Sequence, residues 1–304
     1  MKQFLIKKLF ISQPAQQYLT LSIFENNIRE KVFIQTNKSW TEVSKYQFIL
    51  CQNPFIVGIW FNEKSDLLSN NAWIKITDGG LNDLVMICLQ KIEIVDLQQG
   101  RLILFKLIRS KFLFIPRIHQ KLLISYFYLQ RKNAVSFFEL NSFCATYTYP
   151  RKVILTCFGQ TNDYNLFPMD LQGYIKEADI YVLGLRNSNV TLKKILNERR
   201  VVVCDVASNE KERLVGLGRH HSSQPPSMSD LPFTFDQTAV FKMLIPDIAN
   251  SYRELEIIHH MNMGSHTVMI GKVVNQNLKA VDLPSLYHLH IASAIIKQND
   301  YSVI

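Results

Sequence analysis

The sequence predicts a mainly β protein of the α+β class, with a small closed barrel in its C-terminal part. Short runs rich in Ile, Val, Phe and Trp recur along the chain, and Asn, Gly, Asp and Pro separate them. Between two of the later runs stands a single segment with helical periodicity. This arrangement favours a small barrel over a doubly wound parallel sheet. At 304 residues the chain is long enough for two domains.

Composition excludes several classes of protein. Hydrophobic residues make up 47% of the chain and charged residues 19%, so we expect an ordinary buried core. The five cysteines are scattered and form no C-x-x-C pair, which argues against a disulfide framework and against a thiolate metal site. No apolar run is long enough to cross a bilayer, and the basic, apolar start lacks the pattern of a signal peptide. We therefore expect a cytoplasmic protein.

Charge divides the chain into two parts. Residues 1–135 hold 18 Lys and Arg against 9 Asp and Glu, whereas the rest holds 16 of each. Histidine has the opposite bias, because seven of the eight follow residue 219. This contrast predicts two units with different tasks.

Residues 1–100 read as a β-rich domain of unknown role. The predicted strands are short apolar runs separated by the turn signals Asn-Pro-Phe and Asp-Gly-Gly. They are KVFIQT, YQFILC, FIVGIWF, AWIKIT and KIEIV. No catalytic motif is found in this part.

The segment from Arg101 to Lys132 contains eight Lys and Arg and no acidic residue. Leu, Ile and Phe recur at spacings near three and four, which is typical of helix, and Pro116 predicts a break before a second helix over about 117–131. We expect a basic helical connector over 101–135. Alternatively, residues 101–132 contact a membrane surface or a protein. No motif predicts nucleic-acid binding.

Residues 136–304 read as alternating strands and turns. KVILTCF, ADIYVLGL and RRVVVCDV are predicted strands, and NVTLKKILNER is the predicted helix. A Ser- and Pro-rich stretch follows, and ELEIIHHMNMG then pairs with SHTVMIGKVVNQ as an antiparallel hairpin. LYHLHIASAII is the last predicted strand.

Two interruptions of this pattern predict a site for a nucleotide-like cofactor. In NLFPMDLQGYI, Pro168 stiffens an extended backbone that offers polar groups to the edge of a flat ring. In LRNSNVTLKKI, a strand gives way to a helix whose start favours an anion, with Arg186 adding charge. The sequence lacks the glycine-rich motifs of Rossmann and Walker sites.

These segments carry a resemblance to a known family. YPRKVILTCF, NLFPMDLQGYI, YVLGLRNSNVTLKKI, RRVVVCDVAS, GSHTVMIGKV and LYHLHIASA follow one another in the order and spacing of the flavin-reductase-like family with the FMN-binding split β-barrel. The resemblance covers residues of about 144–296 and none of residues 1–135. It implies a C-terminal split β-barrel over 136–304 with one or more short helices, FMN as cofactor and NAD(P)H as reductant.

The resemblance and the residues together give the candidate cofactor-binding set. Its members contact the ring or the phosphate: Asn165, Phe167, Pro168, Met169, Asp170, Leu171, Arg186, Asn187, Ser188, Asn189 and Thr191. The alternatives are an ordinary turn at Asn165, core packing for the three apolar side chains, and a helix cap by Ser188 or Asn189 beside a solvated Arg186. The family often has small hydroxyl residues where this chain has Met169 and Asp170, and an acidic side chain beside a flavin is unfavourable. We therefore expect Asp170 to point elsewhere or to accept a backbone hydrogen bond.

Two histidines are the candidate catalytic residues. The resemblance implies that His266, in Gly-Ser-His, lies near the flavin and the nicotinamide, and the alternative is a histidine satisfied by a carbonyl group. His221 lies in the Ser- and Pro-rich loop, which either folds over the flavin or is a solvent loop. Glu254 and Glu256 alternate with apolar residues and predict a polar strand face. We expect no metal site, because no clustered carboxylate or thiolate completes a ligand set.

The function implied is that of an FMN-binding NAD(P)H-dependent flavin reductase or oxidoreductase, passing hydride from the nicotinamide to flavin N5. Its partners would be small flavin and nicotinamide molecules and, as the resemblance implies, a second copy in a homodimer. Two alternatives remain. One is a non-catalytic flavin-binding protein with a partner-binding N-terminal module, and the other is a membrane-peripheral scaffold.

Overall fold

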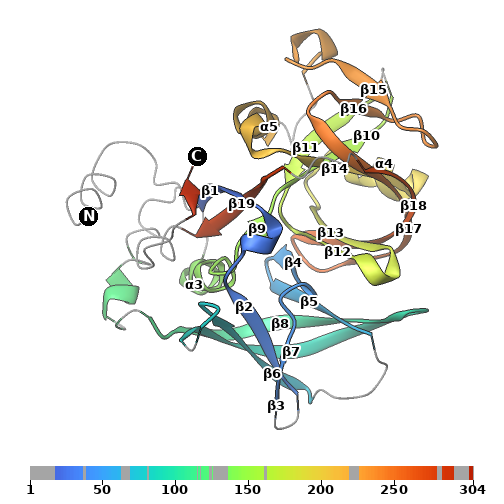
Figure 1. The fold of residues 1–304 in the computed structure, drawn as a ribbon. Coiled ribbons are helices and arrows are strands. Elements are labelled where there is room, and N and C mark those ends of the chain that lie inside the picture. The colour runs from blue at the N-terminus through green and yellow to red at the C-terminus, as the bar shows by residue number, and fades with distance from the viewer. Residues whose placement is uncertain are drawn as a thin grey trace.

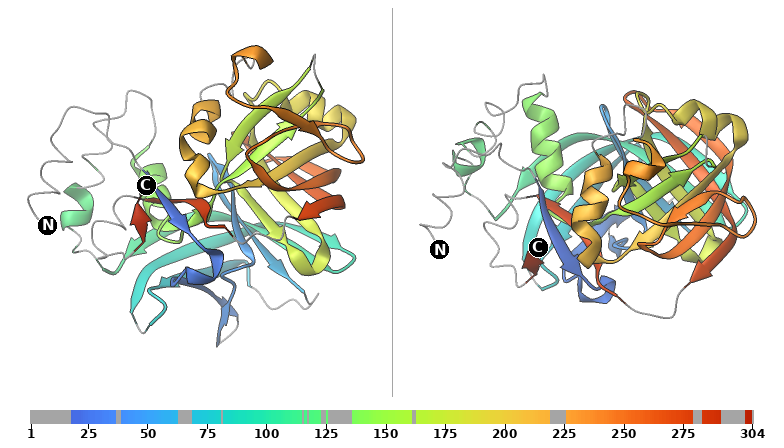
Figure 2. Two further views of the ribbon diagram at one scale, coloured as in Figure 1. Left: turned by 45° about the horizontal axis from the view of Figure 1, so that its top comes forward. Right: turned by 90° about the horizontal axis from the view of Figure 1, so that it is seen from above.

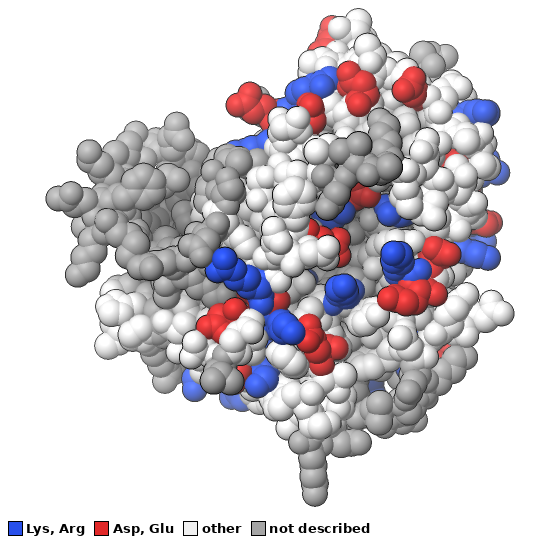
Figure 3. All heavy atoms as spheres, in the orientation of Figure 1, with Lys and Arg blue, Asp and Glu red and all other residues white. Residues whose placement is uncertain are grey.

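The computed structural model describes residues 18–36, 39–62, 69–80, 82–114, 116, 118–122, 125, 136–160, 163–218, 226–278, 283–290 and 301–303. The expected β-rich fold is confirmed, since two seven-stranded antiparallel sheets make up most of it (Figure 1). In the described part of the chain, no helix is long and apolar enough to cross a membrane. On the face drawn in Figure 3, basic and acidic side chains are interspersed.

The first sheet belongs to the N-terminal part and has the strand order β3-β2-β6-β7-β8-β5-β4. Long β7 and β8 form its centre and curve across the bottom of Figure 1. The five strands expected from the sequence all fall within it. Their bounds are β2 Lys31–Thr36, β3 Ser39–Glu42, β4 Gln47–Gln52, β5 Phe55–Phe61, β6 Asn71–Thr77, β7 Asp83–Leu97 and β8 Gly100–Phe112.

The basic helical connector predicted over 101–135 is wrong for its first part, because Gly100–Phe112 is strand β8, paired with β5 and β7. Leu102 and Leu104 pack into one apolar cluster, and Ile103 and Phe105 pack into another on the opposite face. A strand buried on both faces loses its polar alternation, so its apolar residues imitate helical spacing. Residues 118–122 are helical, and most of the second predicted helix lies outside the described residues.

The second sheet has the order β11-β10-β14-β17-β18-β13-β12 and curls around its own core (Figure 2). The predicted hairpin of β17 and β18 is confirmed, and so is the predicted helix, α4, between β13 and β14. The bounds are β10 Ile154–Phe158, β11 Asn165–Met169, β12 Gln172–Ile175, β13 Ile180–Arg186, α4 Leu192–Glu198, β14 Arg200–Val206, β17 Ala249–Asn262 and β18 His266–Leu278.

A small third sheet joins distant parts of the sequence in the order β20-β1-β19-β9. Its strands are β1 Tyr18–Ile23, β9 Arg151–Lys152, β19 Ser285–His290 and β20 Ser302–Val303, and β15 Phe235–Gln237 pairs separately with β16 Leu244–Pro246. The helices are α3 Phe137–Thr146 and α5 Lys211–Leu217, with short 3-10 turns η1 Glu25–Asn27, η2 Lys176–Ala178, η3 Ser208–Glu210 and η5 Met228–Asp230. Ser136 and Glu139 form a capping box that fixes where α3 begins.

The two large sheets pack directly on each other. Apolar residues of β4, β5 and β8 form one cluster with residues of β12, β13 and β18. Two glycines permit the close approach, because a Cβ at Gly173 would lie 1.8 Å from Phe48 Cδ1, and a Cβ at Gly184 would lie 2.0 Å from the backbone oxygen of Leu50. The N-terminal sheet therefore covers the β12–β13–β18 face of the curled sheet.

Candidate functional site

Three segments of the family resemblance, which contain Leu171, Arg186 and His266, meet in space. Leu171, which follows β11, accepts a backbone hydrogen bond of 2.8 Å from Gly184 on β13. Arg186, at the end of β13, pairs in register with His266 at the start of β18. Asn187 N donates to Ser265 O over 3.0 Å, and the Asn187 side chain donates to Gly264 O over 2.6 Å. The convergence follows from strand pairing alone.

His266 lies at the centre of this meeting point and is 2% exposed. Its Nδ1 lies 2.7 Å from Ser265 Oγ and 3.7 Å from Cys51 Sγ on β4. Its Nε2 is buried and has no hydrogen-bond partner in the described part of the chain. Burial and then the charge of Arg186 lower the His266 pKa to about 4, although Asp170 acts in the opposite direction. His266 is therefore neutral at pH 7, and the charges of Arg186 and Asp170, which belong to the other two segments, both affect its pKa.

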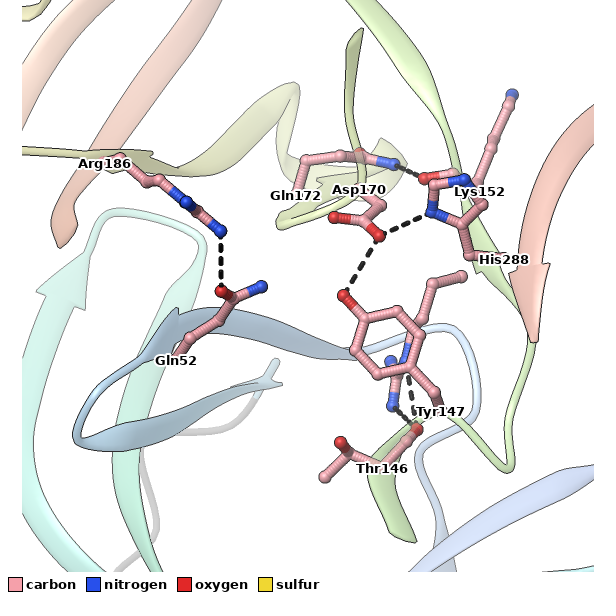
Figure 4. A network of polar contacts seen from close by, with 9 residues as sticks. Gln52, Thr146, Tyr147, Lys152, Asp170, Gln172, Arg186 and His288 are labelled. Atoms are coloured by element: carbon pink, nitrogen blue, oxygen red, sulfur yellow. Dashed lines mark hydrogen bonds and ion pairs between the residues drawn. The ribbon is translucent and has the colours of Figure 1, made fainter. Parts of the chain in front are cut away.

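Asp170 carries the carboxylate of this region, and its side chain is 17% exposed. Its Oδ2 accepts hydrogen bonds from Tyr147 Oη, over 3.0 Å, and from His288 Nδ1 on β19, over 2.8 Å. Burial acts to raise the Asp170 pKa, but the bond and charge of His288, with the bond from Tyr147, outweigh it and hold the pKa below its ordinary value. Figure 4 shows the other carboxylate oxygen, Oδ1, directed toward the side where Arg186 and Gln52 lie.

Two arginines near Asp170 differ in their exposure and in their hydrogen-bond partners. Arg186 is exposed, and its Nη2 donates to Gln52 Oε1 on β4 over 3.2 Å (Figure 4). Within the described ranges no carboxylate lies within ion-pair distance of it. Arg151 is 7% exposed and donates to Thr146 O and to Gln47 Oε1, so it is held by uncharged groups, and burial lowers its pKa to about 10. Arg186 is thus the cation available to an anionic ligand.

We call the group formed by Gln52, Tyr147, Asp170, Arg186 and His266 the junction site, because it lies where β4 of the N-terminal sheet meets the curled sheet. Its members come from five separate places in the sequence. It combines an arginine without an ion-pair partner, a half-buried carboxylate, and a neutral histidine with one nitrogen that has no hydrogen-bond partner, all judged among the described residues. Such a set suits a ligand with an anionic or hydrogen-bond-accepting end and a flat polar edge.

A pocket, here called the outer pocket, lies at the start of α4. Asn165 Nδ2 donates to Thr191 Oγ1 over 2.6 Å, so the predicted ring loop and the predicted phosphate loop touch here as well. Both side chains are buried, at 2% and 3% exposure. The pocket is lined by Phe158, Asp163, Tyr164, Asn165, Val190, Thr191 and Lys194.

The remaining predicted site residues have other surroundings. Phe167, Met169 and Leu171 are buried and belong to the largest apolar cluster of the described residues. Pro168 is half-buried, and Ser188 is exposed at the loop. Asn187 Oδ1 accepts from Thr267 Oγ1, and Asn189 Oδ1 accepts from Thr191 N. His221 lies outside the described residues.

The polar strand face predicted for Glu254 and Glu256 is wrong for Glu254. Glu254 is fully buried, and its carboxylate accepts from Val240 N, Phe241 N and Asn275 Nδ2, whereas Glu256 is exposed. The register between β17 and β18 shifts between Glu254 and Leu255, and such a bulge turns neighbouring side chains to new directions. Glu254 therefore anchors the turn before β16 instead of facing solvent.

Sequence reasoning missed three residues of the region: Gln52, Tyr147 and His288 as the partner of Asp170. Gln52 ends a strand of the other sheet, and Tyr147 follows α3, so neither belongs to a motif. The strand periodicity of His288 and His290 was the available signal. That spacing places both histidines on one strand face and does not tell them apart, whereas in the structure His288 reaches Asp170 and His290 Nε2 lies 3.0 Å from Cys144 Sγ.

No family model matches the chain, and no curated protein matches it. Among solved structures it is similar to the FMN-binding protein of Thermus thermophilus, with 17% identity, a TM-score of 0.40, and coverage of 45% of this chain and 77% of that one. It is similar to the NADH:FAD oxidoreductase SgcE6 of Streptomyces globisporus, with 11% identity, a TM-score of 0.45, and coverage of 52% and 92%. It is also similar to BorF, the flavin reductase component of a bacterial two-component tryptophan halogenase, with 10% identity, a TM-score of 0.42, and coverage of 49% and 96%. Likeness at this level decides neither the fold nor the function of this chain.

Proposed function

We propose that this chain is an FMN-binding flavoprotein with a split β-barrel, acting as an NAD(P)H-dependent oxidoreductase. The observation that carries the proposal is the convergence of the three sequence segments at the junction site. Among the described residues, the buried Nε2 of His266 has no hydrogen-bond partner and Arg186 has no ion-pair partner, and both groups fit a polar ring with an anionic tail. A flavin would supply hydride transfer with NAD(P)H as the reductant.

In this proposal the residues of the chain bind, orient and shield the cofactor. His266 would donate or accept at the ring edge, and Arg186 with the exposed Ser188 would hold the phosphate. Asn187, Asn189 and Thr191 make internal hydrogen bonds, which in this proposal shape the loop that holds the phosphate. The N-terminal sheet covers the face beside the junction site and would exclude water there.

The proposal extends to location and assembly. None of the five cysteines forms a disulfide, so we propose a reducing, cytoplasmic compartment. A homodimer and the choice between NADH and NADPH rest on the resemblance. The N-terminal sheet already occupies one face of the curled sheet, so a second copy would dock on another face.

The first prediction concerns Arg186→Ala. We expect the wild-type protein to bind FMN and to show absorbance in the visible region, and we expect the variant to bind FMN at least 10-fold more weakly. The physical reason is the loss of one charge-assisted contact, which contributes about 1.5–3 kcal/mol. Titration of FMN followed by flavin fluorescence measures both dissociation constants.

The matched control is Lys193→Ala, which removes the same charge from the exposed side of α4. Equal weakening by both variants would show a general charge effect and would reject the Arg186 assignment. A wild-type protein that stays colourless after soaking in FMN would reject the flavoprotein proposal. Binding of FMN without NADH or NADPH oxidation would leave the non-catalytic flavin-binding protein as the function.

A further inference from the structure

The two seven-stranded sheets share one topology. In chain order, the strands of the N-terminal sheet are β2 to β8, and those of the curled sheet are β10 to β14, β17 and β18. When each strand of the first series is replaced by the strand at the same place in the second, the order β3-β2-β6-β7-β8-β5-β4 becomes β11-β10-β14-β17-β18-β13-β12, which is the observed order of the curled sheet. All pairings in both sheets are antiparallel. The described part of the chain therefore contains the same sheet twice.

The repeat extends to the register of the strands. The pair Glu256–Lys272 of the β17–β18 hairpin corresponds to Gln90–Lys106 of the β7–β8 hairpin, and the other pairs of β17 and β18 follow in step. Irregularities of register recur at the same places, and such bulges are retained features of a fold. They lie between Glu254 and Leu255, Ile257 and His259, and Asp205 and Val206 in the curled sheet, and between Cys88 and Leu89, Lys91 and Glu93, and Ile76 and Thr77 in the N-terminal sheet. The two sheets are therefore copies of one structural unit.

The two copies contact each other through the same positions. In this register, Leu102 and Leu104 of β8 correspond to Val268 and Ile270 of β18. All four side chains are buried in the one apolar cluster that joins the sheets, and Figure 1 shows β4 and β5 beside β12 and β13. An interface in which both partners use the same patch is that of a two-fold dimer. The chain thus contains within itself the contact that two identical subunits would make.

The N-terminal sheet contributes to the junction site across this interface. Gln52 Oε1 accepts from Arg186 Nη2. The next residue, Asn53, holds the loop before β18, because Ser265 N donates to Asn53 O over 2.7 Å and Asn53 N donates to Ser265 Oγ over 3.0 Å. Ser265 Oγ in turn lies 2.7 Å from His266 Nδ1. The place of His266 therefore depends on the N-terminal sheet.

The equivalence can also be fixed beside β4 and β12. Trp60 N on β5 donates to Tyr46 O over 2.8 Å, and Gly184 N on β13 donates to Leu171 O over 2.8 Å. In both copies the acceptor is the residue immediately before the edge strand, which is β4 in one and β12 in the other. These two bonds therefore show which residues of the N-terminal sheet correspond to members of the junction site.

The counterpart of the junction site lacks its functional groups. Asp170, Arg186 and His266 correspond to Lys45, Asn62 and Gly100. A lysine thus stands in place of the carboxylate, and a glycine without a side chain in place of the histidine. The Asn62 side chain carries no charge, and it accepts from Trp60 Nε1 over 2.7 Å. The two copies therefore share their architecture, but only the curled sheet has the charged and imidazole groups.

We propose that the N-terminal sheet is a built-in partner of the curled sheet, in the place that a second subunit would take in a two-fold dimer. The pair forms one cofactor site per chain, and no residue of a second chain contributes to it. The statement about the cofactor rests on the proposed function, whereas the pairing of the two copies does not.

The first test counts cofactors. Titration of FMN into the full-length protein, followed by flavin fluorescence, should give one FMN per chain, with a dissociation constant that stays the same when the protein is diluted about 100-fold. Lys45→Ala, which removes an exposed charge at the counterpart, should leave FMN affinity unchanged, whereas Arg186→Ala weakens it. Two FMN per chain, or weaker binding by Lys45→Ala, would overturn the loss of the counterpart site. Binding that weakens on dilution would overturn a site built within one chain.

The second test needs no cofactor. The three tryptophans, Trp40, Trp60 and Trp73, all lie in the N-terminal sheet, so tryptophan fluorescence follows the unfolding of that copy. Ile270→Ala removes apolar atoms from the curled side of the interface and should lower the urea midpoint of this signal by about 1 M. Val274→Ala, at a 42% exposed position of the same strand, is the matched control and should not lower it.

The two tests separate the two proposals. An unchanged midpoint in Ile270→Ala would overturn the built-in partner, because the N-terminal sheet would then be stable without the curled sheet. A lowered midpoint in a protein that binds no FMN would overturn the proposed function and the single cofactor site, and it would support the pairing of the two copies.

Discussion

Gly184→Ala is expected to destabilise the protein by about 3 kcal/mol, the upper part of the range for overpacking in a core. The new Cβ would lie 2.0 Å from the backbone oxygen of Leu50, and a backbone atom cannot rotate away as a side chain can. β4 must then move off β13, and the apolar cluster between the two sheets loses its fit. Urea unfolding at pH 7.5, with the midpoint and slope compared to the wild type, measures the change.

Gly216→Ala provides the control for this substitution. Gly216 lies in α5, and nothing lies within 4 Å of a Cβ placed there. Alanine is the better helix former, so this variant should gain about 0.5–1 kcal/mol. If Gly184→Ala unfolded at the same urea concentration as the wild type, the close contact between β4 and β13 would not exist. The covering of the curled sheet would then need another explanation.

Acid is expected to destabilise the protein through His266 between about pH 6.5 and pH 4. The unfolded chain binds a proton near the ordinary histidine pKa of 6.5, whereas the folded protein resists protonation until about pH 4. As the pH falls through this window the unfolded state is favoured, so stability present above pH 6.5 is lost. The loss by pH 4.5 should be about 2–3 kcal/mol. Urea unfolding at pH 7.5 and at pH 4.5 gives the difference.

The variant His266→Gln cannot take up this proton, and its stability should depend on pH less steeply by the same amount. Asp170 and Asp205 act in a different window, because their pKa values are lowered by folding and their contributions are lost only below their ordinary pKa of about 3.8. An identical pH dependence in the variant and the wild type would show that His266 is not held neutral by its surroundings.

Local sequence patterns predicted most strands. They failed where a strand is buried on both faces or where a charged residue is buried. The β17–β18 hairpin was predictable because its apolar residues alternate along SHTVMIGKVV, and α4 because its apolar residues follow a helical period. β8 was not predictable as a strand, because both of its faces are buried. The local sequence does not show which parts of the fold cover those faces. The bulge beside Glu254 was equally invisible, because it depends on the pairing with β18.

The candidate site was predictable only in the part that strand pairing fixes. The Leu171, Arg186 and His266 segments meet because their strands are neighbours in one sheet, and their motifs mark the strand ends. The contribution of Gln52 depends on how the other sheet docks, which is set by packing between Gly184 and Leu50. The environment of Asp170 depends on Tyr147, a residue outside any motif. We expected Asp170 to point away from a flavin or to accept a backbone hydrogen bond. In the structure the side chains of Tyr147 and His288 donate to its Oδ2.

The pairing of β1 with β19 has a consequence for biosynthesis. Residues 18–23 are translated well before their partner, residues 285–290. Until then the nascent chain carries Leu21 and Ile23, which are buried in the finished protein, without the strand that covers them. Those side chains would be a target for chaperones during translation, and the small sheet would close only after residues 285–290 have left the ribosome.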